Sequence, residues 1–187
     1  MSFGDDLAAG LRAHVPTTVL ENEHRDRMLR LLDAGPDAFS RDHFTPGHFT
    51  ASAFVLSPDR SELLLIHHRK LGMWLQPGGH VETCDRDIIA SARREVEEEV
   101  GLADLSLLHP GTFDLDVHNI PARKTEPAHE HFDVRMLFGT ETRELGRCEE
   151  ILDARWVPFG EVENLHSDES VMRAMRRLGG FEASAAG

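Results

Sequence analysis

Three glutamates in one short stretch have the spacing best suited to chemistry. Glu95, Glu98 and Glu99 stand at i, i+3 and i+4 of the segment RREVEEEVGL, so on a helix their carboxylates share one arc about 100° wide. Like charges at these spacings repel each other, and an oxygen-preferring cation such as Mg²⁺ would relieve the repulsion. The spacing therefore favours a divalent-cation site, while a solvated acidic face is the alternative for such a helix taken alone.

The residues around these glutamates predict how they are held. A helix is expected over residues 87–100, and Gly101 would end it as a C-cap. Just upstream, GGHVETCDRD supplies a glycine turn that lets the backbone approach a ligand, followed by an acidic residue at the start of the helix. The apolar positions of the helix lie on a separate arc and form its predicted core face: Ile89, Ala92, Val96 and Val100.

With this pattern the sequence resembles the Nudix hydrolase family, whose signature is Gly, five residues, Glu, seven residues, then Arg-Glu-apolar-any-Glu-Glu-any-Gly-apolar. Asp85 replaces the first Glu, eight residues rather than seven precede Arg94, and Cys84 stands where glycine is usual. These departures lie ahead of the carboxylate stripe, and we expect the resemblance to cover residues 47–160 approximately. The matching positions are Gly79, Asp85, Arg94, Glu95, Val96, Glu98, Glu99, Gly101 and Leu102.

The resemblance implies a fold and an activity. The fold would be a Nudix-type α/β/α sandwich with a mixed sheet, in the α/β (α+β) class. The activity would be cleavage of a diphosphate linkage, in a nucleoside diphosphate derivative or a related metabolite, with Mg²⁺ or Mn²⁺ as cofactor.

The resemblance also implies roles for individual residues. Arg94 would hold a carboxylate in place, and one of the helix glutamates would take the proton of the attacking water. Glu149 and Glu150, which precede the segment ILDARWVP, are alternatives for that proton acceptor. The implied cation ligands, one of them a backbone carbonyl, are Gly78, Glu95, Glu98 and Glu99.

The twelve histidines are a second chemical signal. In HEHFDVR, His129 and His131 alternate, so on a strand they share a face with Asp133 and Arg135. Imidazoles clustered near carboxylates suit Zn²⁺, Fe²⁺ or Ni²⁺ better than Mg²⁺. The alternative is that they contact substrate phosphates, or each other through water. The residues of this predicted second metal or phosphate site are His48, His80, His118, His129 and His131.

Part of this set is similar to the metal site of isopentenyl diphosphate isomerase, itself a Nudix-fold enzyme. His48, His80, His129 and His131 occupy the places of four metal-binding residues there. The cysteine of the isomerase would fall at Gly78 and its acidic proton donor at His131, which argues against isomerase chemistry. A non-catalytic, nucleotide-sensing Nudix domain is another alternative, and the three clustered glutamates disfavour it.

Four further residues are predicted to contact substrate. Trp74 would stack on a base or pack in the core. Three basic residues would supply positive charge from loops, and a pair of them could clamp terminal phosphates: Arg69, Arg123 and Lys124.

The elements that must position these residues follow from periodicity. We expect an N-terminal helical extension over residues 1–45 and a Nudix hydrolase domain over 46–187, with strands around one central helix and a C-terminal helix starting near Ser167. Leucines at helical spacing in the extension predict packing on the domain or on a second copy in a homodimer.

Composition limits the partners. Lys and Arg number 20 against 33 Asp and Glu, a formal net charge of −13, which disfavours binding to a nucleic acid polymer. No apolar run has the roughly 20 residues that a membrane span needs, and the two cysteines match neither a disulfide framework nor a thiolate zinc site. The sequence therefore predicts a cytoplasmic protein, and the Nudix resemblance implies a small-molecule diphosphate as its substrate.

Overall fold

One mixed β-sheet carries the fold, seen here in a computed structural model that describes residues 2–146, 148–149, 151–165 and 168–185, with side chains described up to residue 179. β1 is central: it pairs in parallel with β7 and antiparallel with β2 and β4. β6 and β5 pair with β7, while β3 and β8 pair with β2. The strands are β1 (Gly47–Leu56), β2 (Glu62–His68), β3 (Met73–Leu75), β4 (Gly78–His80), β5 (Ser106–Leu107), β6 (Asp114–Ile120), β7 (His129–Gly139) and β8 (Ile151–Pro158).

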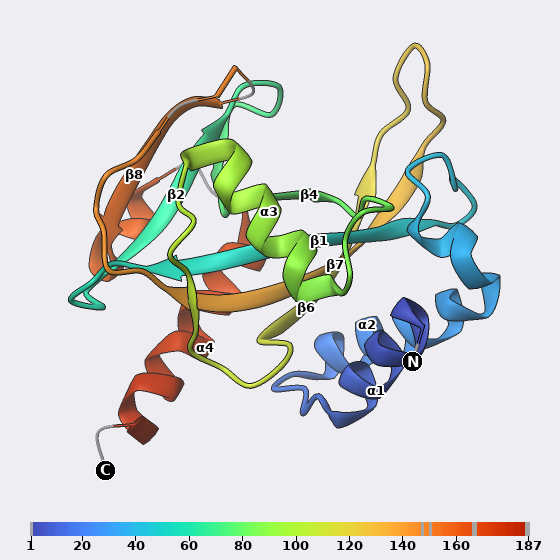
Figure 1. Cartoon of the computed structure of the whole chain (residues 1–187), viewed down its shortest axis with the longest axis horizontal. Coiled ribbons are helices and arrows are strands. Elements are labelled where there is room, and N and C mark those ends of the chain that lie inside the picture. Colours follow the sequence, from blue (N-terminus) through green and yellow to red (C-terminus); the bar gives the residue numbers. More distant parts are fainter. Residues whose placement is uncertain (1, 147, 150, 166–167, 186–187) are drawn as a thin grey trace.

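The predicted carboxylate helix is α3 (Ile88–Val100), which lies across β1 and β7 (Figure 1). It begins where the Asp87 side chain accepts a hydrogen bond from the Ala90 N–H, and it ends at Gly101. Gly101 has φ of 73°, a left-handed conformation that costs little without a Cβ. Of its four predicted core residues, Ala92, Val96 and Val100 are buried against the sheet, whereas Ile89 is only partly buried there.

Alternate side chains of β1 face opposite sides of the sheet. Phe49, Ala51, Ala53 and Val55 face the core under α3, whereas Phe54 and Leu56 face the core on the opposite side of the sheet. That opposite core is covered by the C-terminal helix α4 (Glu169–Ala185) through Val171, Ala174 and Leu178. Helix, sheet and helix form the layers of an α/β/α sandwich, so the predicted fold class is confirmed.

Short elements complete the sheet and lead into the C-terminal helix. In β5 only Ser106 and Leu107 pair with β7. At the start of α4, Ser167 lies outside the described residues, and the Asp168 carboxylate accepts a hydrogen bond from the Val171 N–H at 3.0 Å. A short 3₁₀ segment, η2 (Phe159–Asn164), connects β8 to this helix.

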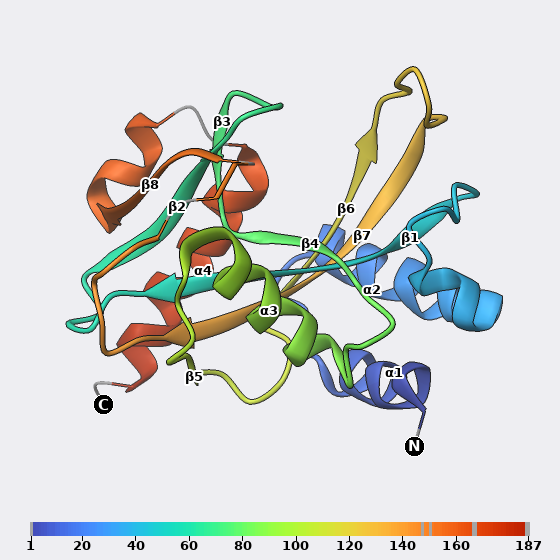
Figure 2. The ribbon, with the colours of Figure 1, turned by 45° about the horizontal axis from the view of Figure 1, so that its top comes forward.

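The N-terminal segment packs on the sheet layer that also carries α3. It consists of α1 (Phe3–Ala13), α2 (Val19–Leu31) and the 3₁₀ segment η1 (Leu32–Phe39). Figure 2 shows α1 and α2 side by side near the β6–β7 pair. The leucine stripe predicted to need a partner joins the main core through Leu7, Leu11, Met28 and Leu31.

A buried carboxylate joins this segment to α4. Glu21 accepts hydrogen bonds at 2.7 Å from His14 Nε2 and from the Arg177 guanidinium, and a third at 2.6 Å from the Thr17 N–H. Burial alone would raise the pKa of Glu21, but these hydrogen bonds and the charge of Arg177 lower it to about 2. Ionised Glu21 therefore stabilises the folded state.

The Glu21 contact predicts how stability depends on pH. Because its pKa is lower in the folded than in the unfolded chain, its contribution is complete above about pH 5 and is lost as pH falls toward 2. We expect Glu21→Gln to lower the free energy of unfolding at pH 7 by about 3 kcal/mol and to flatten this acid limb. Urea unfolding from pH 2 to 7 measures both, with exposed Glu23→Gln as control; parallel profiles for Glu21→Gln and the wild type would contradict the assignment.

Candidate active site

A cleft of about 580 Å³ brings the carboxylate helix, the glycine strand and the histidine set together. Its walls come from β1, β4, β6 and β7 on one side and from α3 on the other. Elements that lie far apart in the sequence therefore form a single polar cavity.

The three helix glutamates line one end of the cleft together with Gly78. Glu99 is buried and accepts a hydrogen bond from the Gly78 N–H at 3.0 Å, while Glu98 is exposed to solvent. The Glu95 carboxylate lies so close to Gly79 that a Cβ there would sit 2.6 Å from its Oε2 atom. The glycine pair, predicted as a turn that would approach a ligand, lies in β4, and Gly79 makes its close approach to the Glu95 carboxylate.

Arg94 holds this group of acids in place. Its Nε and Nη2 atoms donate to the two oxygens of Asp85 at 3.0 Å each, and Nη1 donates to Glu95 at 2.9 Å and Glu98 at 3.1 Å. Nη2 also donates to the carbonyl oxygen of His80 at 2.8 Å. One guanidinium thus joins the loop, the glycine strand and two carboxylates of α3.

The electrostatics of Glu95 favour a cation among the helix carboxylates. The pKa of Glu95 is raised to about 7, mainly by burial and also by the nearby charges of Glu98 and Glu82, against the lowering effect of Arg94. A carboxylate with a raised pKa among other carboxylates is stabilised by any cation placed between them. Oxygen ligands of this kind fit Mg²⁺ or Mn²⁺.

The five predicted histidines come together in the same cleft. His48 on β1 lies directly opposite His131 on β7, and His131 lies opposite His118 on β6. Ring centroids are 4.9 Å apart for His48 and His131, 5.1 Å for His48 and His80, and 5.2 Å for His129 and His131. Four neighbouring strands therefore contribute one continuous imidazole cluster.

Comparison with known proteins places this geometry in a family. A family model described as NUDIX domain matches residues 46–178, which extends beyond the expected end near residue 160 to include most of α4. The chain belongs to the Nudix family. No curated protein matches its sequence.

Solved Nudix structures share the fold. An Ap4A hydrolase from C. elegans has a TM-score of 0.60 at 17% identity, covering 73% of this chain and 98% of that one. A NUDIX-family hydrolase from Clostridium perfringens has a TM-score of 0.55 at 24% identity, covering 72% and 97%. The NUDIX domain of Shewanella oneidensis NrtR, complexed with ADP ribose, has a TM-score of 0.55 at 17% identity, covering 80% and 95%.

The departures from the Nudix signature do not break its contacts. Asp85 reaches both Nε and Nη2 of Arg94 despite the extra residue between them, and it also accepts hydrogen bonds from the Ser91 hydroxyl and the Glu82 N–H. Cys84 is exposed in the loop. The extra residue of this loop therefore lies before the helix, and the spacing of the three helix glutamates is unaffected.

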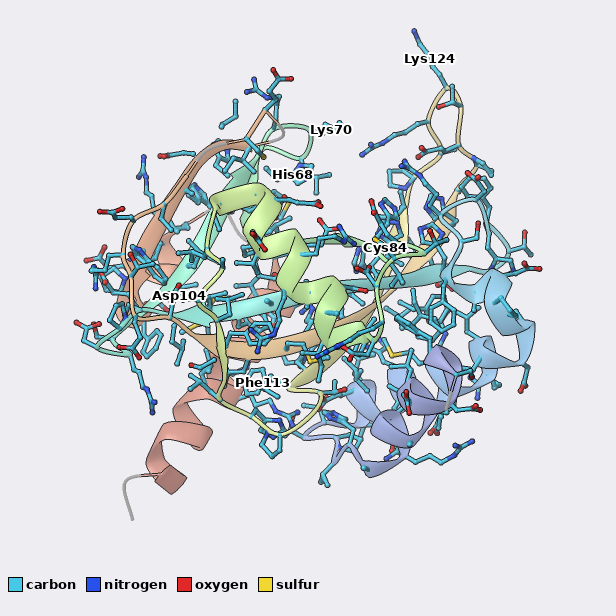
Figure 3. All side chains as sticks on the ribbon, viewed as in Figure 1. His68, Lys70, Cys84, Asp104, Phe113 and Lys124 are labelled. Carbon is cyan, nitrogen blue, oxygen red and sulfur yellow. The ribbon has the colours of Figure 1, made fainter. Side chains whose placement is uncertain are left out.

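The predicted substrate residues take different positions around the Nudix cleft. Arg123 lines the cleft, whereas Lys124 projects into solvent at the end of the β6–β7 loop (Figure 3). Trp74 packs in the core under α4 and stacks on His67. Arg69 donates to the backbone carbonyl of Glu149 at 2.8 Å and so ties β2 to the start of β8.

Of the two predicted alternative proton acceptors, the structure describes Glu149 alone. Glu149 has an exposed side chain and is not among the described residues that line the cleft. Glu150 lies outside the described residues. A catalytic role for either one stays a prediction.

Sequence patterns missed a buried polar floor beneath the histidines. Asp133 accepts hydrogen bonds from Ser52 at 2.8 Å, from Thr50 at 3.2 Å and from Arg135 at 2.8 Å. Arg135 is almost fully buried and also contacts Asp114. The alternation of HEHFDVR placed Asp133 and Arg135 on the correct face, but the hydroxyl partners on β1 require the strand pairing to be known.

The Arg94 contacts predict a large effect of a conservative change. Lysine keeps the charge but cannot reproduce the planar set of donors, so we expect Arg94→Lys to lower the free energy of unfolding by about 2–4 kcal/mol. Amide hydrogen exchange of residues 79–85 should also accelerate more than that of the helix core.

Arg86→Lys is the matched control, because that side chain is 84% exposed and pairs only with its neighbour Asp87 among the described residues. Its effect should stay within about 0.5 kcal/mol. Equal stability of the two variants would show that Arg94 does not hold the loop.

Proposed function

We propose that this protein is a divalent-cation-dependent Nudix hydrolase that cleaves a diphosphate linkage in a nucleoside diphosphate derivative or a related small metabolite. The observation that carries the proposal is that Glu95, Glu98 and Glu99 line one open polar cleft together with Gly78. A protein that only binds a ligand has no need of three repelling carboxylates on one helix, two of them held by Arg94.

The described residues fit the cation that the family implies. Glu95, Glu98, Glu99 and the carbonyl of Gly78 would hold it, since all are oxygen donors at the same end of the cleft. Such a cation, Mg²⁺ or Mn²⁺, would neutralise the diphosphate, polarise phosphorus and acidify a water molecule.

The chain itself supplies the other requirements. Glu98, exposed beside the buried Glu99, is the residue we propose to accept the proton of the attacking water. Arg41, Lys70 and Arg123 line the cleft and bring positive charge to a protein whose net charge of −13 would otherwise repel a diphosphate.

Two alternatives receive less support. Isomerase-like chemistry lacks its cysteine, since Gly78 occupies that place, and its acidic donor, since His131 does. A nucleotide-sensing domain is consistent with the fold of the ADP-ribose-bound NrtR domain, but it leaves the carboxylates unexplained.

Partners and location are part of the proposal. Among the described residues no helix combines the length and apolar character needed to cross a membrane. A cytoplasmic location, and a homodimer, stay predictions from the sequence. We propose a small-molecule partner rather than a nucleic acid polymer.

The proposed activity is tested by a screen of diphosphate metabolites with Mg²⁺ and with Mn²⁺. The assay measures the phosphate-containing products of cleavage. Cleavage of at least one diphosphate linkage that stops on chelation and resumes on adding the cation supports the proposal. Ligand binding without turnover across the screen would favour the sensing alternative.

Substitution of the helix glutamates gives the sharper prediction. Glu98→Gln and Glu99→Gln each remove a ligand charge, so we expect hydrolysis to fall at least about 10²-fold while the fold is kept. Glu97→Gln is the matched control, because Glu97 lies on the same helix, is exposed and does not line the cleft among the described residues. Turnover of the first two variants equal to that of Glu97→Gln would contradict the cation site.

A further inference from the structure

The imidazole cluster has the composition of a second metal site. His48, His80 and His131 each offer a ring nitrogen, and these three atoms all lie within 4.8 Å of one another. Each histidine comes from a different strand, and the three strands are direct neighbours in the order β4, β1, β7. The sheet pairing itself therefore holds the three rings together, which is the rigid support that a metal site requires.

Hydrogen bonding determines which nitrogen of His48 is available. Its Nδ1 atom lies 3.1 Å from the carbonyl oxygen of His43, and since a carbonyl only accepts, Nδ1 must carry the hydrogen. In the neutral ring the Nε2 atom then carries the lone pair. Nε2 is buried and has no hydrogen-bond partner among the described residues, in a side chain whose residue is only 1% exposed.

A carbonyl oxygen that fixes the far nitrogen of a histidine is the usual outer contact of a metal ligand. His129, beside the group, shows the same arrangement, with Nδ1 2.8 Å from the Pro127 carbonyl. A buried ring nitrogen without a partner is otherwise costly, by about 1–3 kcal/mol. An ion bound at His48 Nε2 would satisfy this atom.

The same geometry argues against direct contact between His48 and a phosphate. Neutral His48 has already used its single N–H on His43, and its Nε2 can only accept. A phosphate oxygen also accepts, so the pair would repel, whereas a cation would be attracted.

We propose that His48, His80 and His131 bind one transition-metal ion of the Zn²⁺ type, separate from the cation at the helix glutamates. At metal–nitrogen distances of about 2.0–2.1 Å in a tetrahedral site, ligand nitrogens stand about 3.3 Å apart. The imidazoles must therefore turn inward by small side-chain rotations on binding. Three protein ligands leave a fourth position for water or a substrate oxygen, as in catalytic rather than structural zinc sites.

This ion would add positive charge to the cleft. Three neutral histidines and a divalent ion carry a net charge of +2, close to the cation-binding glutamates and to Arg123 in the same cavity. The open position would accept an oxygen of the diphosphate. That role for the ion rests on the proposed hydrolase function, whereas the binding of the ion does not.

The test uses full-length protein without a histidine tag, stripped of metal by a chelator and kept in excess Mg²⁺ to occupy the glutamates. Zn²⁺ is titrated by calorimetry, and Co²⁺ by its visible absorption, which distinguishes tetrahedral from octahedral coordination. We expect one tight ion per chain. His80→Gln and His131→Gln should each weaken it at least about 10²-fold, since changing even an outer contact of a metal ligand costs 10–100-fold.

Two control variants separate this site from the rest of the protein. His67→Ala removes a histidine that stacks on Trp74 outside the cluster, and it should bind Zn²⁺ as the wild type does. Glu98→Gln should also keep the tight ion, even where hydrolysis is lost, so failure of the hydrolase proposal and failure of this one give different results. Thermal melting confirms that each variant is folded, and His80→Gln, on a short and partly exposed strand, remains the test where His131→Gln does not fold.

Three results would overturn the inference. The first is a wild-type protein that binds no Zn²⁺ or Co²⁺ tightly. The second is a tight ion whose affinity does not change in His80→Gln or His131→Gln. The third is binding of inorganic phosphate that depends on these histidines in the absence of any metal, which would make them direct substrate contacts.

Discussion

The active-site end of the cleft depends on a single guanidinium surrounded by acids. Arg94 neutralises Asp85 and contacts Glu95 and Glu98, so carboxylates that would repel one another can stand at helical spacing beside a buried strand. Partly buried charges are tolerated only when they are paired and hydrogen-bonded. Because the same guanidinium also holds the His80 carbonyl, the position of the helix glutamates and the path of the glycine strand are coupled.

The parallel pairing of β1 with β7 is the second constraint. It joins residues that are more than 80 positions apart in the sequence and places His48 opposite His131. Below this row, Asp133 joins hydroxyls of β1 to buried Arg135, and Arg135 reaches the acids of β6. His118 also contacts this network, since its Nδ1 atom lies 3.0 Å from Asp116. The histidine face is therefore supported by a connected polar layer rather than by apolar packing alone.

Local sequence patterns predicted the carboxylate helix and the polar strand face, but not which residues contact one another across the sheet. The i, i+3, i+4 spacing and Gly101 identified α3, and alternation in HEHFDVR identified the polar face of β7. Trp74 and Arg69 were assigned to substrate because residue type does not distinguish a stacking platform from core packing, or a clamp from a link between strands. The Asp133 contacts and the hydrogen on His48 Nδ1 depend on pairing across the sheet, which no window of sequence contains.

The two groups of ligands in the cleft differ in their donor atoms. The glutamates offer carboxylate oxygens, and the pKa of Glu95 is raised mainly by burial, with the nearby charges of Glu98 and Glu82 adding to the shift. The histidines are neutral nitrogen donors, because burial and their mutual proximity lower the pKa of His80 and His131. Hard cations select the first kind of ligand and borderline transition ions the second. With a cation bound at the glutamates and another at the histidines, a diphosphate lying between the two groups would meet positive charge on both sides, although the protein as a whole is acidic.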